Sequence, residues 1–94
     1  MVRRRVDFRE AIIRAAYRFR LAGDLDNSGR SLEVCRSIAR EISDSAFLAR
    51  CELNQGLLYI AQGRNLPAMN SLLESERLSL KTNDPLGYAR ALNA

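Results

Sequence analysis

The sequence predicts an all-α protein built from antiparallel helical hairpins. Apolar residues recur at helical spacing from one end of the chain to the other, and no stretch alternates polar and apolar residues as a half-buried strand does. The connections between the expected helices are a few residues long, which makes successive helices antiparallel neighbours. No linker or low-complexity run divides the 94 residues, so residues 1–94 are expected to form one domain.

The first helix is expected over roughly residues 6–22. One face carries five apolar residues, which are Phe8, Ile12, Ala15, Ala16 and Phe19. A second apolar strip lies beside it and consists of Ile13, Tyr17 and Leu21. The two strips together predict a helix that packs on two sides, and Gly23 supplies its C-terminal stop.

The second helix is expected over about residues 27–42, with Asp24 or Asp26 as its N-cap. Its apolar residues repeat at helical spacing and are Leu32, Cys35, Ile38, Ala39 and Ile42. Gly23 and the aspartates keep the connection to the first helix short, which predicts a hairpin.

The third helix follows an N-cap at Ser43 or Asp44 and ends before Gly63. Its apolar face is expected to consist of Ala46, Ala49, Leu53, Gly56, Leu57 and Ile60. Asn65 can cap a fourth helix with Pro67 in its first turn, where a missing N–H costs nothing. The expected apolar face of the fourth helix contains Met69, Leu72, Leu73 and Leu80.

The composition disfavours most catalytic and metal chemistry. The chain has no histidine, the residue on which neutral-pH acid/base catalysis and most zinc sites depend. Cys35 and Cys51 stand alone, which predicts two buried, reduced thiols acting as small hydrophobic residues. We therefore expect no enzyme, no cofactor and no metal.

The longest uncharged apolar run, residues 56–61, is far shorter than the roughly 20 residues that cross a bilayer. The Arg-rich start is not followed by the apolar core of a signal peptide. The sequence therefore predicts a cytoplasmic protein with no membrane partner.

The sequence also repeats itself with a period of 40 residues. The shift aligns Gly23 with Gly63, Phe19 with Tyr59, and Leu32 with Leu72. A fixed period of this size is typical of stacked supersecondary units. Small residues let helix backbones approach closely, the aromatic fills the space within the hairpin, and glycine releases the chain into the turn.

The order of residues within the unit resembles the tetratricopeptide repeat. The first unit carries Ala16, Phe19, Gly23, Ser28, Leu32 and Cys35, and the second carries Gly56, Tyr59, Gly63, Ala68, Leu72 and Ser75. The period exceeds the about 34 residues of the standard unit, and Ile12 and Glu52 replace the aromatic that opens the motif. The longer unit is similar to the repeats of MalT-like bacterial transcription regulators, signalling proteins and kinesin light chains.

The resemblance implies a short α-solenoid of two repeats, about 6–43 and 45–83, and a partial third helix over 85–94. The competing interpretation is an ordinary four-helix bundle with two similar hairpins. At the end of the chain, Leu86, Tyr88, Ala89 and Leu92 give an apolar surface that a solenoid does not leave bare. We therefore expect either a fragment of a longer repeat protein or a homo-oligomer stacked end to end.

The resemblance further implies a non-catalytic protein–protein interaction module, regulatory or scaffolding, that binds a helix or peptide in a concave groove. The residues carried over to this groove are Ile13, Arg14, Tyr17, Arg20, Arg50, Leu53, Asn54, Leu57, Ile60 and Arg90. An apolar floor with arginine edges suits a partner with acidic groups. Leu53, Leu57 and Ile60 have a structural alternative, which is packing against a neighbouring repeat, and the Asn54 amide is either satisfied locally or offered to a ligand.

An alternative function is nucleic-acid binding through the basic N-terminal region. The first twenty residues carry seven arginines against Asp7 and Glu10. The arginines do not form one stripe on a helical wheel, and no helix-turn-helix with a polar recognition face is visible. Solvation of a helix surface is the simpler use of these charges.

Overall fold

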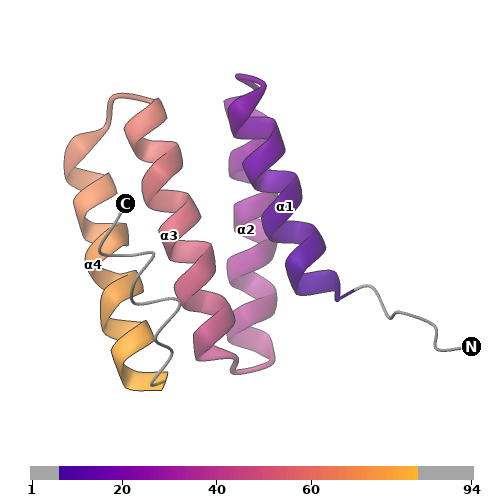
Figure 1. Cartoon of the computed structure of the whole chain (residues 1–94), viewed down its shortest axis with the longest axis vertical. Helices are drawn as coiled ribbons and strands as arrows, with labels where there is room; N and C mark the ends of the chain where they lie inside the picture. The colour runs from indigo at the N-terminus through magenta and orange to yellow at the C-terminus, as the bar shows by residue number, and fades with distance from the viewer. Residues whose placement is uncertain (1–6, 83–94) are drawn as a thin grey trace, which may run out of the picture.

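The computed structural model describes residues 7–82, which contain four helices and no strand. They are α1 (Phe8–Leu21), α2 (Leu25–Glu41), α3 (Ser45–Ala61) and α4 (Asn65–Thr82) (Figure 1). The all-α prediction is confirmed for this part of the chain. The expected first and second helices lie within two residues of the observed bounds, and the expected helix over 85–94 lies outside the described residues.

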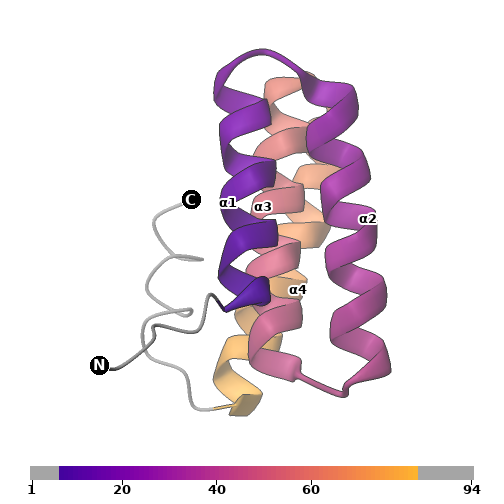
Figure 2. The same cartoon turned by 90° about the vertical axis from the view of Figure 1, so that its right-hand side faces the viewer.

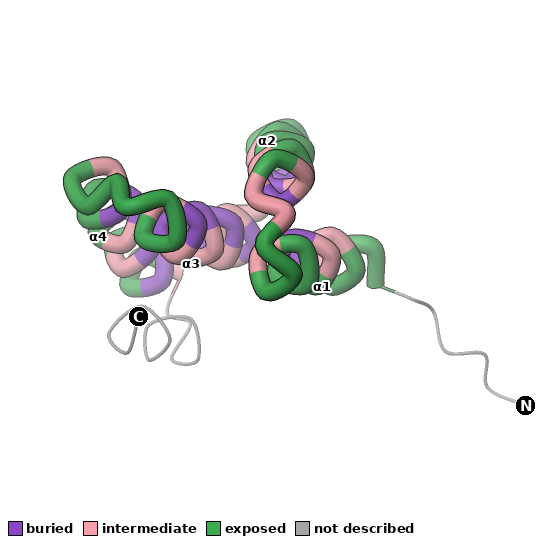
Figure 3. The backbone as a smooth tube through the Cα atoms, turned by 90° about the horizontal axis from the view of Figure 1, so that it is seen from above, coloured by how far each residue is buried: buried purple, intermediate pink, exposed green. Residues whose placement is uncertain are grey.

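The helices form two antiparallel hairpins, α1–α2 and α3–α4, and α1 and α3 run in the same direction (Figures 1 and 2). α3 packs against both helices of the first hairpin and against α4. α1 contacts both α2 and α3, but its two expected apolar strips are only partly covered, because Phe8, Tyr17, Phe19 and Leu21 are exposed. Among the described helices, α4 contacts α3 alone and lies at one edge (Figure 3).

Three helices begin at an aspartate whose carboxylate accepts a backbone N–H of the first turn. Asp7 accepts the N–H of Arg9, Asp24 that of Asn27, and Asp44 that of Phe47. Of the candidate N-caps, Asp24 and not Asp26 therefore caps α2, and Asp44 and not Ser43 caps α3. Asn65, the cap expected for the fourth helix, is instead the first residue of α4.

The turns end each of the first three helices in the same way. Gly23 and Gly63 adopt left-handed backbone conformations, with φ of 83° and 74°. The N–H of the following residue then reaches back to a carbonyl of the last turn, at 2.8 Å in both cases. Ser43 does the same without being a glycine, with φ of 53°.

Two apolar clusters hold the two hairpins together. One consists of Ile13, Cys35, Ala39, Phe47 and Cys51, and the other of Ala16, Leu32 and Leu58. Each cluster draws side chains from α1, α2 and α3. The core is thus the junction between the hairpins, with α3 at its centre.

The expectation of two reduced thiols is wrong, because Cys35 and Cys51 form a disulfide that joins α2 to α3. Both side chains are fully buried, as expected. The antiparallel pairing of α2 with α3 brings the two Cα atoms to 6.0 Å, within the range that a disulfide needs. Spacing along the sequence does not show this proximity, since it depends on how the two helices pack.

The expected apolar face of α4 is wrong for three of its four residues. Met69, Leu73 and Leu80 are exposed, and Leu72 is half-buried. The buried residues are instead mostly small, and they are Ala68, Ser71, Ser75, Leu78 and Ser79.

The close packing of α3 against α4 explains why small residues of α4 are buried in place of the larger apolar ones. A Cβ placed on Gly56 of α3 would lie 2.7 Å from Cδ2 of Leu72, so the missing side chain lets α4 approach. The hydroxyl of Ser75 donates to the carbonyl of Ala49 at 2.7 Å across this contact. Small residues fill most of the narrow interface together with Leu72 and Leu78, while Met69, Leu73 and Leu80 stay exposed.

Candidate functional site

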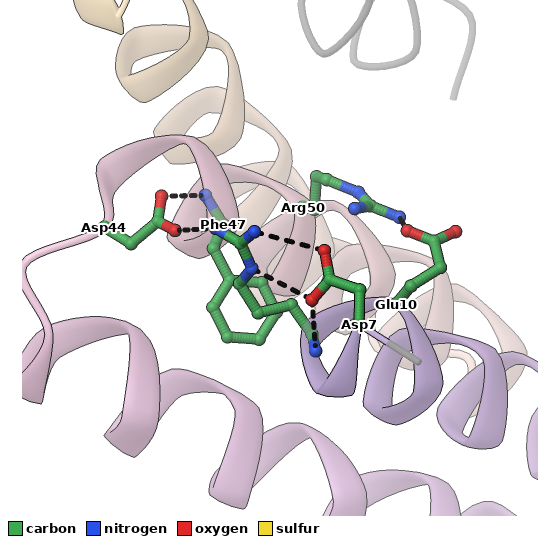
Figure 4. Close-up of polar contacts among 6 residues, drawn as sticks. Asp7, Glu10, Asp44, Phe47 and Arg50 are labelled. Atoms are coloured by element: carbon green, nitrogen blue, oxygen red, sulfur yellow. Dashed lines mark hydrogen bonds and ion pairs between the residues drawn. The ribbon is translucent and has the colours of Figure 1, made fainter. Parts of the chain in front are cut away.

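The predicted groove corresponds to the surface along the exposed sides of α1 and α3. At one end of this surface, Arg50 of α3 forms an ion pair with Glu10 of α1, with N and O atoms 2.7 Å apart (Figure 4). The two helices run in the same direction, so residues one and two turns further along each helix face the same side. Arg14 and Tyr17 of α1 thereby share a surface with Asn54 and Leu57 of α3. We call these four residues and the Glu10–Arg50 pair the α1–α3 face.

The ten predicted site residues do not all lie on this face. Ile13 and Leu53 are 8% and 7% exposed, and Ile13 belongs to the core. Ile60 is exposed, but it lines a groove between α3 and α4. Arg90 lies outside the described residues.

The aromatic and cationic side chains of α1 are the accessible part of the face. Tyr17 is 46% exposed, and the guanidinium of Arg20 lies over its ring at 5.4 Å from the centroid. Within residues 7–82, neither Arg14 nor Arg20 forms an ion pair. Within residues 7–82, the face therefore presents Arg14 outside any ion pair, beside an aromatic ring over which Arg20 lies.

Asn54 is satisfied locally, at least through its amide nitrogen. The side-chain Nδ2 donates to the carbonyl of Arg50, one turn earlier in α3, at 2.9 Å. This geometry matches the local alternative left open by the sequence. The amide oxygen is the part of Asn54 that a ligand can still use.

Arg9, a member of the basic N-terminal cluster, has a structural role that the sequence did not reveal. Its guanidinium contacts the carboxylates of Asp7 and Asp44, at 3.1 and 2.8 Å (Figure 4). The hydrogen bonds from Arg9 to Asp7, and from the Phe47 N–H and Arg9 to Asp44, lower the pKa of both carboxyl groups. One arginine thus links the N-caps of α1 and α3.

Nucleic-acid binding through the remaining members of the basic cluster stays a prediction. Arg3, Arg4 and Arg5 lie outside the described residues, while Arg14 and Arg18 are exposed on α1. With Arg9 bound to two carboxylates, fewer arginines are free for a phosphate backbone.

An exposed apolar surface lies on α4, where the sequence predicts a buried face. Leu66, Met69, Leu73 and Leu80 recur at intervals of three, four and seven residues, so they form one stripe along the helix. All four are exposed. Beside this stripe, α3 and α4 enclose a groove of about 410 Å³ whose lining includes Ile60, Asn65, Met69, Leu72, Leu73 and Glu76.

The described residues thus define an all-helical protein with one polar, arginine-bearing face and one apolar edge. No family model, curated protein or solved structure matches the chain. No helix within residues 7–82 has both the length and the apolar character of a membrane span. In the same range, no three acidic or cysteine side chains are grouped closely enough to hold a metal ion.

Proposed function

We propose that the chain is a short helical-repeat protein of the tetratricopeptide type, with two hairpins stacked as successive units. The packing of α3 against both α1 and α2 supports this proposal, because each new unit of a solenoid packs on both helices of the unit before it. Equivalent contacts support it as well. Ala16 packs with Leu32 in the first hairpin, and Gly56 faces Leu72 in the second, 40 residues later in both cases.

The function we propose is that of a non-catalytic protein–protein interaction module. The observation that carries it is the α1–α3 face, on which exposed Tyr17 and Arg14 lie beside half-buried Leu57. An aromatic ring and an aliphatic side chain supply contact area, and Arg14, which forms no ion pair within residues 7–82, supplies charge-assisted hydrogen bonds. The partner that fits is an amphipathic helix or extended peptide with acidic residues.

The wider context implied by the resemblance is a regulatory or scaffolding role in a larger bacterial regulator in the cytoplasm. The Cys35–Cys51 disulfide bears on this proposal, since disulfides persist more readily in oxidising compartments than in the cytosol. Trapping the thiols of these cysteines in intact cells would show whether they are bonded where the protein works.

Selection of peptides from a random displayed library against the full chain tests the interaction proposal. We expect the selected peptides to combine Asp or Glu with apolar residues. Arg14→Glu and Tyr17→Ala should each weaken their binding by about tenfold, since a contact of about 1.4 kcal/mol changes affinity tenfold. Both side chains are exposed, so neither change should disturb the fold.

Arg30→Glu is the matched control, because it makes the same charge reversal at an exposed site on α2, away from the face. Equal loss of binding in Arg30→Glu and Arg14→Glu would show only a general charge effect. Peptides that bind all these variants equally would place the interaction site elsewhere.

A further inference from the structure

The junction between the hairpins shows how a groove between paired helices is filled. Leu58 of α3 is only 1% exposed, because it enters the groove between α1 and α2. It clusters there with Ala16 and Leu32, Leu25 packs against this cluster, and a Cβ placed on Gly29 would lie 3.6 Å from Cδ2 of Leu58. This first groove is therefore occupied by a leucine from the next helix.

The groove between α3 and α4 repeats this arrangement without an occupant from the described helices. The residues 40 positions after those that surround Leu58 are Gly56, Asn65, Leu72 and Met69. The last three line the groove of about 410 Å³. Asn65 stands in place of Leu25 and Met69 in place of Gly29. The exposed methionine adapts readily to what packs on it.

The charge beside the two grooves is reversed. Beside the filled groove, Arg36 of α2 contacts the buried Glu52 of α3, with Nε and Oε1 3.1 Å apart. Glu52 precedes Leu58 by six residues on the incoming helix. Beside the α3–α4 groove, Glu76 occupies the position of Arg36. A helix that enters this groove in the same register therefore needs a cation where α3 has Glu52.

We infer that the α3–α4 groove docks an amphipathic helix of a partner protein, which inserts an apolar side chain and pairs an Arg or Lys, six residues earlier, with Glu76. The inference rests on the repeat stacking in the proposed function, but it uses a different surface from the α1–α3 face. The exposed Leu66, Met69 and Leu73 provide the apolar area that such a helix covers.

A second copy of the chain fits this groove poorly. End-to-end stacking would bring α1 of the next copy into the groove, with Ile12 in the position of Glu52 and Arg18 in the position of Leu58. The apolar isoleucine would then face Glu76, and the cation would face Leu72 and Met69. In the expected helix over 85–94, the same register places Leu92 where α3 has Glu52, so this segment supplies no cation to Glu76 either. Charge complementarity thus favours a helix of another protein over both α1 of a second copy and residues 85–94.

The test is a charge exchange with a peptide taken from the chain itself. Two labelled peptides of residues 45–61 are used, one with native Glu52 and one with Glu52→Arg, both carrying Cys51→Ser to prevent disulfide exchange. Each is titrated by fluorescence anisotropy against the full chain and against its Glu76→Arg variant. We expect the Glu52→Arg peptide to bind the native chain about three- to tenfold tighter than the native peptide, and the order to invert on Glu76→Arg.

Two further variants separate this surface from the α1–α3 face. Leu73→Asp should abolish binding of the Glu52→Arg peptide, whereas Arg14→Glu should leave it unchanged. Leu73 is more than half exposed, and circular dichroism checks that the variant remains folded. Loss of binding on Arg14→Glu alone would assign the peptide to the α1–α3 face and overturn the inference without affecting the proposed function.

Two other outcomes would also overturn the inference. Neither peptide binding the full chain would mean that the groove accepts no partner helix. A dimer in sedimentation that becomes a monomer on Leu73→Asp would assign the groove to a second copy.

Discussion

α3 and α4 belong to the same hairpin and differ by one residue in length, with 17 and 18 residues, yet their surroundings are opposite. α3 contacts the three other described helices, and its buried residues include even Glu52 and Gln55. Among the described helices α4 contacts α3 alone, at one edge of the molecule (Figure 3). It buries three serines and leaves Leu66, Leu73 and Leu80 exposed. Position in the stack, more than apolar character, decides which side chains of these two helices are buried.

Truncating one leucine on each helix should produce the largest difference in stability between α3 and α4. Leu58→Ala should lower the free energy of unfolding by about 3 kcal/mol, because the side chain is fully buried between α1 and α2 and leaves a cavity. Leu73→Ala on α4 should change it by less than about 0.5 kcal/mol, because Leu73 is 56% exposed. Urea unfolding of both variants measures the difference. Similar losses would show that Leu73 is covered by a part of the chain beyond residues 7–82.

Replacing two helical glycines by alanine should have smaller effects on stability, with opposite signs at the two positions. Gly56→Ala places a Cβ 2.7 Å from Cδ2 of Leu72 and 3.3 Å from the carbonyl of Ala68, so it should destabilise by about 1–2 kcal/mol. Gly29→Ala meets only Cδ2 of Leu58 at 3.6 Å, so it should stabilise by about 0.5–1 kcal/mol through better helix propensity. Thermal melts of the two variants compare the contacts that α3 makes with α4 and with α2. Stabilisation by both substitutions would contradict the close α3–α4 approach.

The turns before and after α3 differ by one residue that can be exchanged. Gly63 follows α3 in a left-handed conformation at no steric cost, whereas Ser43 precedes α3 in the same conformation with a side chain. Ser43→Gly should therefore stabilise by up to about 1 kcal/mol, since a left-handed conformation costs an L-residue about 1–2 kcal/mol. The gain is partly offset by the greater freedom of glycine in the unfolded chain. A loss of stability in chemical denaturation would count against this account of the turn.

The buried carboxylate of α3 should make the smallest, pH-dependent contribution. Burial raises the pKa of Glu52 above its ordinary value of 4.5, an effect that the cations of Arg36 and Arg40 oppose. Above pH 4.5, the folded chain then holds a proton that the unfolded chain has released, so this group lowers stability as the pH rises through that window. Glu52→Gln cannot ionise, so its stability relative to the native chain should increase from pH 4.5 to neutral pH.

Chemical denaturation at several pH values measures this difference, with Glu33→Gln as the matched control, because Glu33 is an exposed glutamate on α2. A difference between Glu52→Gln and the native chain that stays constant with pH would show that the cations of Arg36 and Arg40 cancel the effect of burial on the pKa of Glu52.

The bounds of the helices and their turns could be predicted because they depend on local chemistry. Gly23, Gly63, Asp24 and Asp44 act through their own backbone neighbourhoods, which the sequence contains. The buried face of α4 could not be predicted from its leucines, because it depends on how closely α3 approaches. The relevant signal was the row of small residues that includes Ala68 and Ser75, at the spacing of a close helix contact.

The candidate site was predictable in outline only. Helical spacing places Arg14 and Tyr17 on one side of α1, and the 40-residue register relates them to Asn54 and Leu57. Whether Ile13 belongs to that face or to the core depends on the angle at which α1 meets its neighbours, which spacing does not contain. The Cys35–Cys51 bond is a tertiary contact of the same kind.

The guanidinium of Arg9 has a consequence for how the molecule opens. It is shared between the capping carboxylates of α1 and α3, so the first turns of two helices in different hairpins depend on one side chain. Fraying of α1 at Asp7 would release Asp44 from its ion pair and weaken the start of α3. Amide hydrogens in both first turns should therefore exchange with solvent in a correlated manner, which couples the two hairpins cooperatively at a point outside their apolar core.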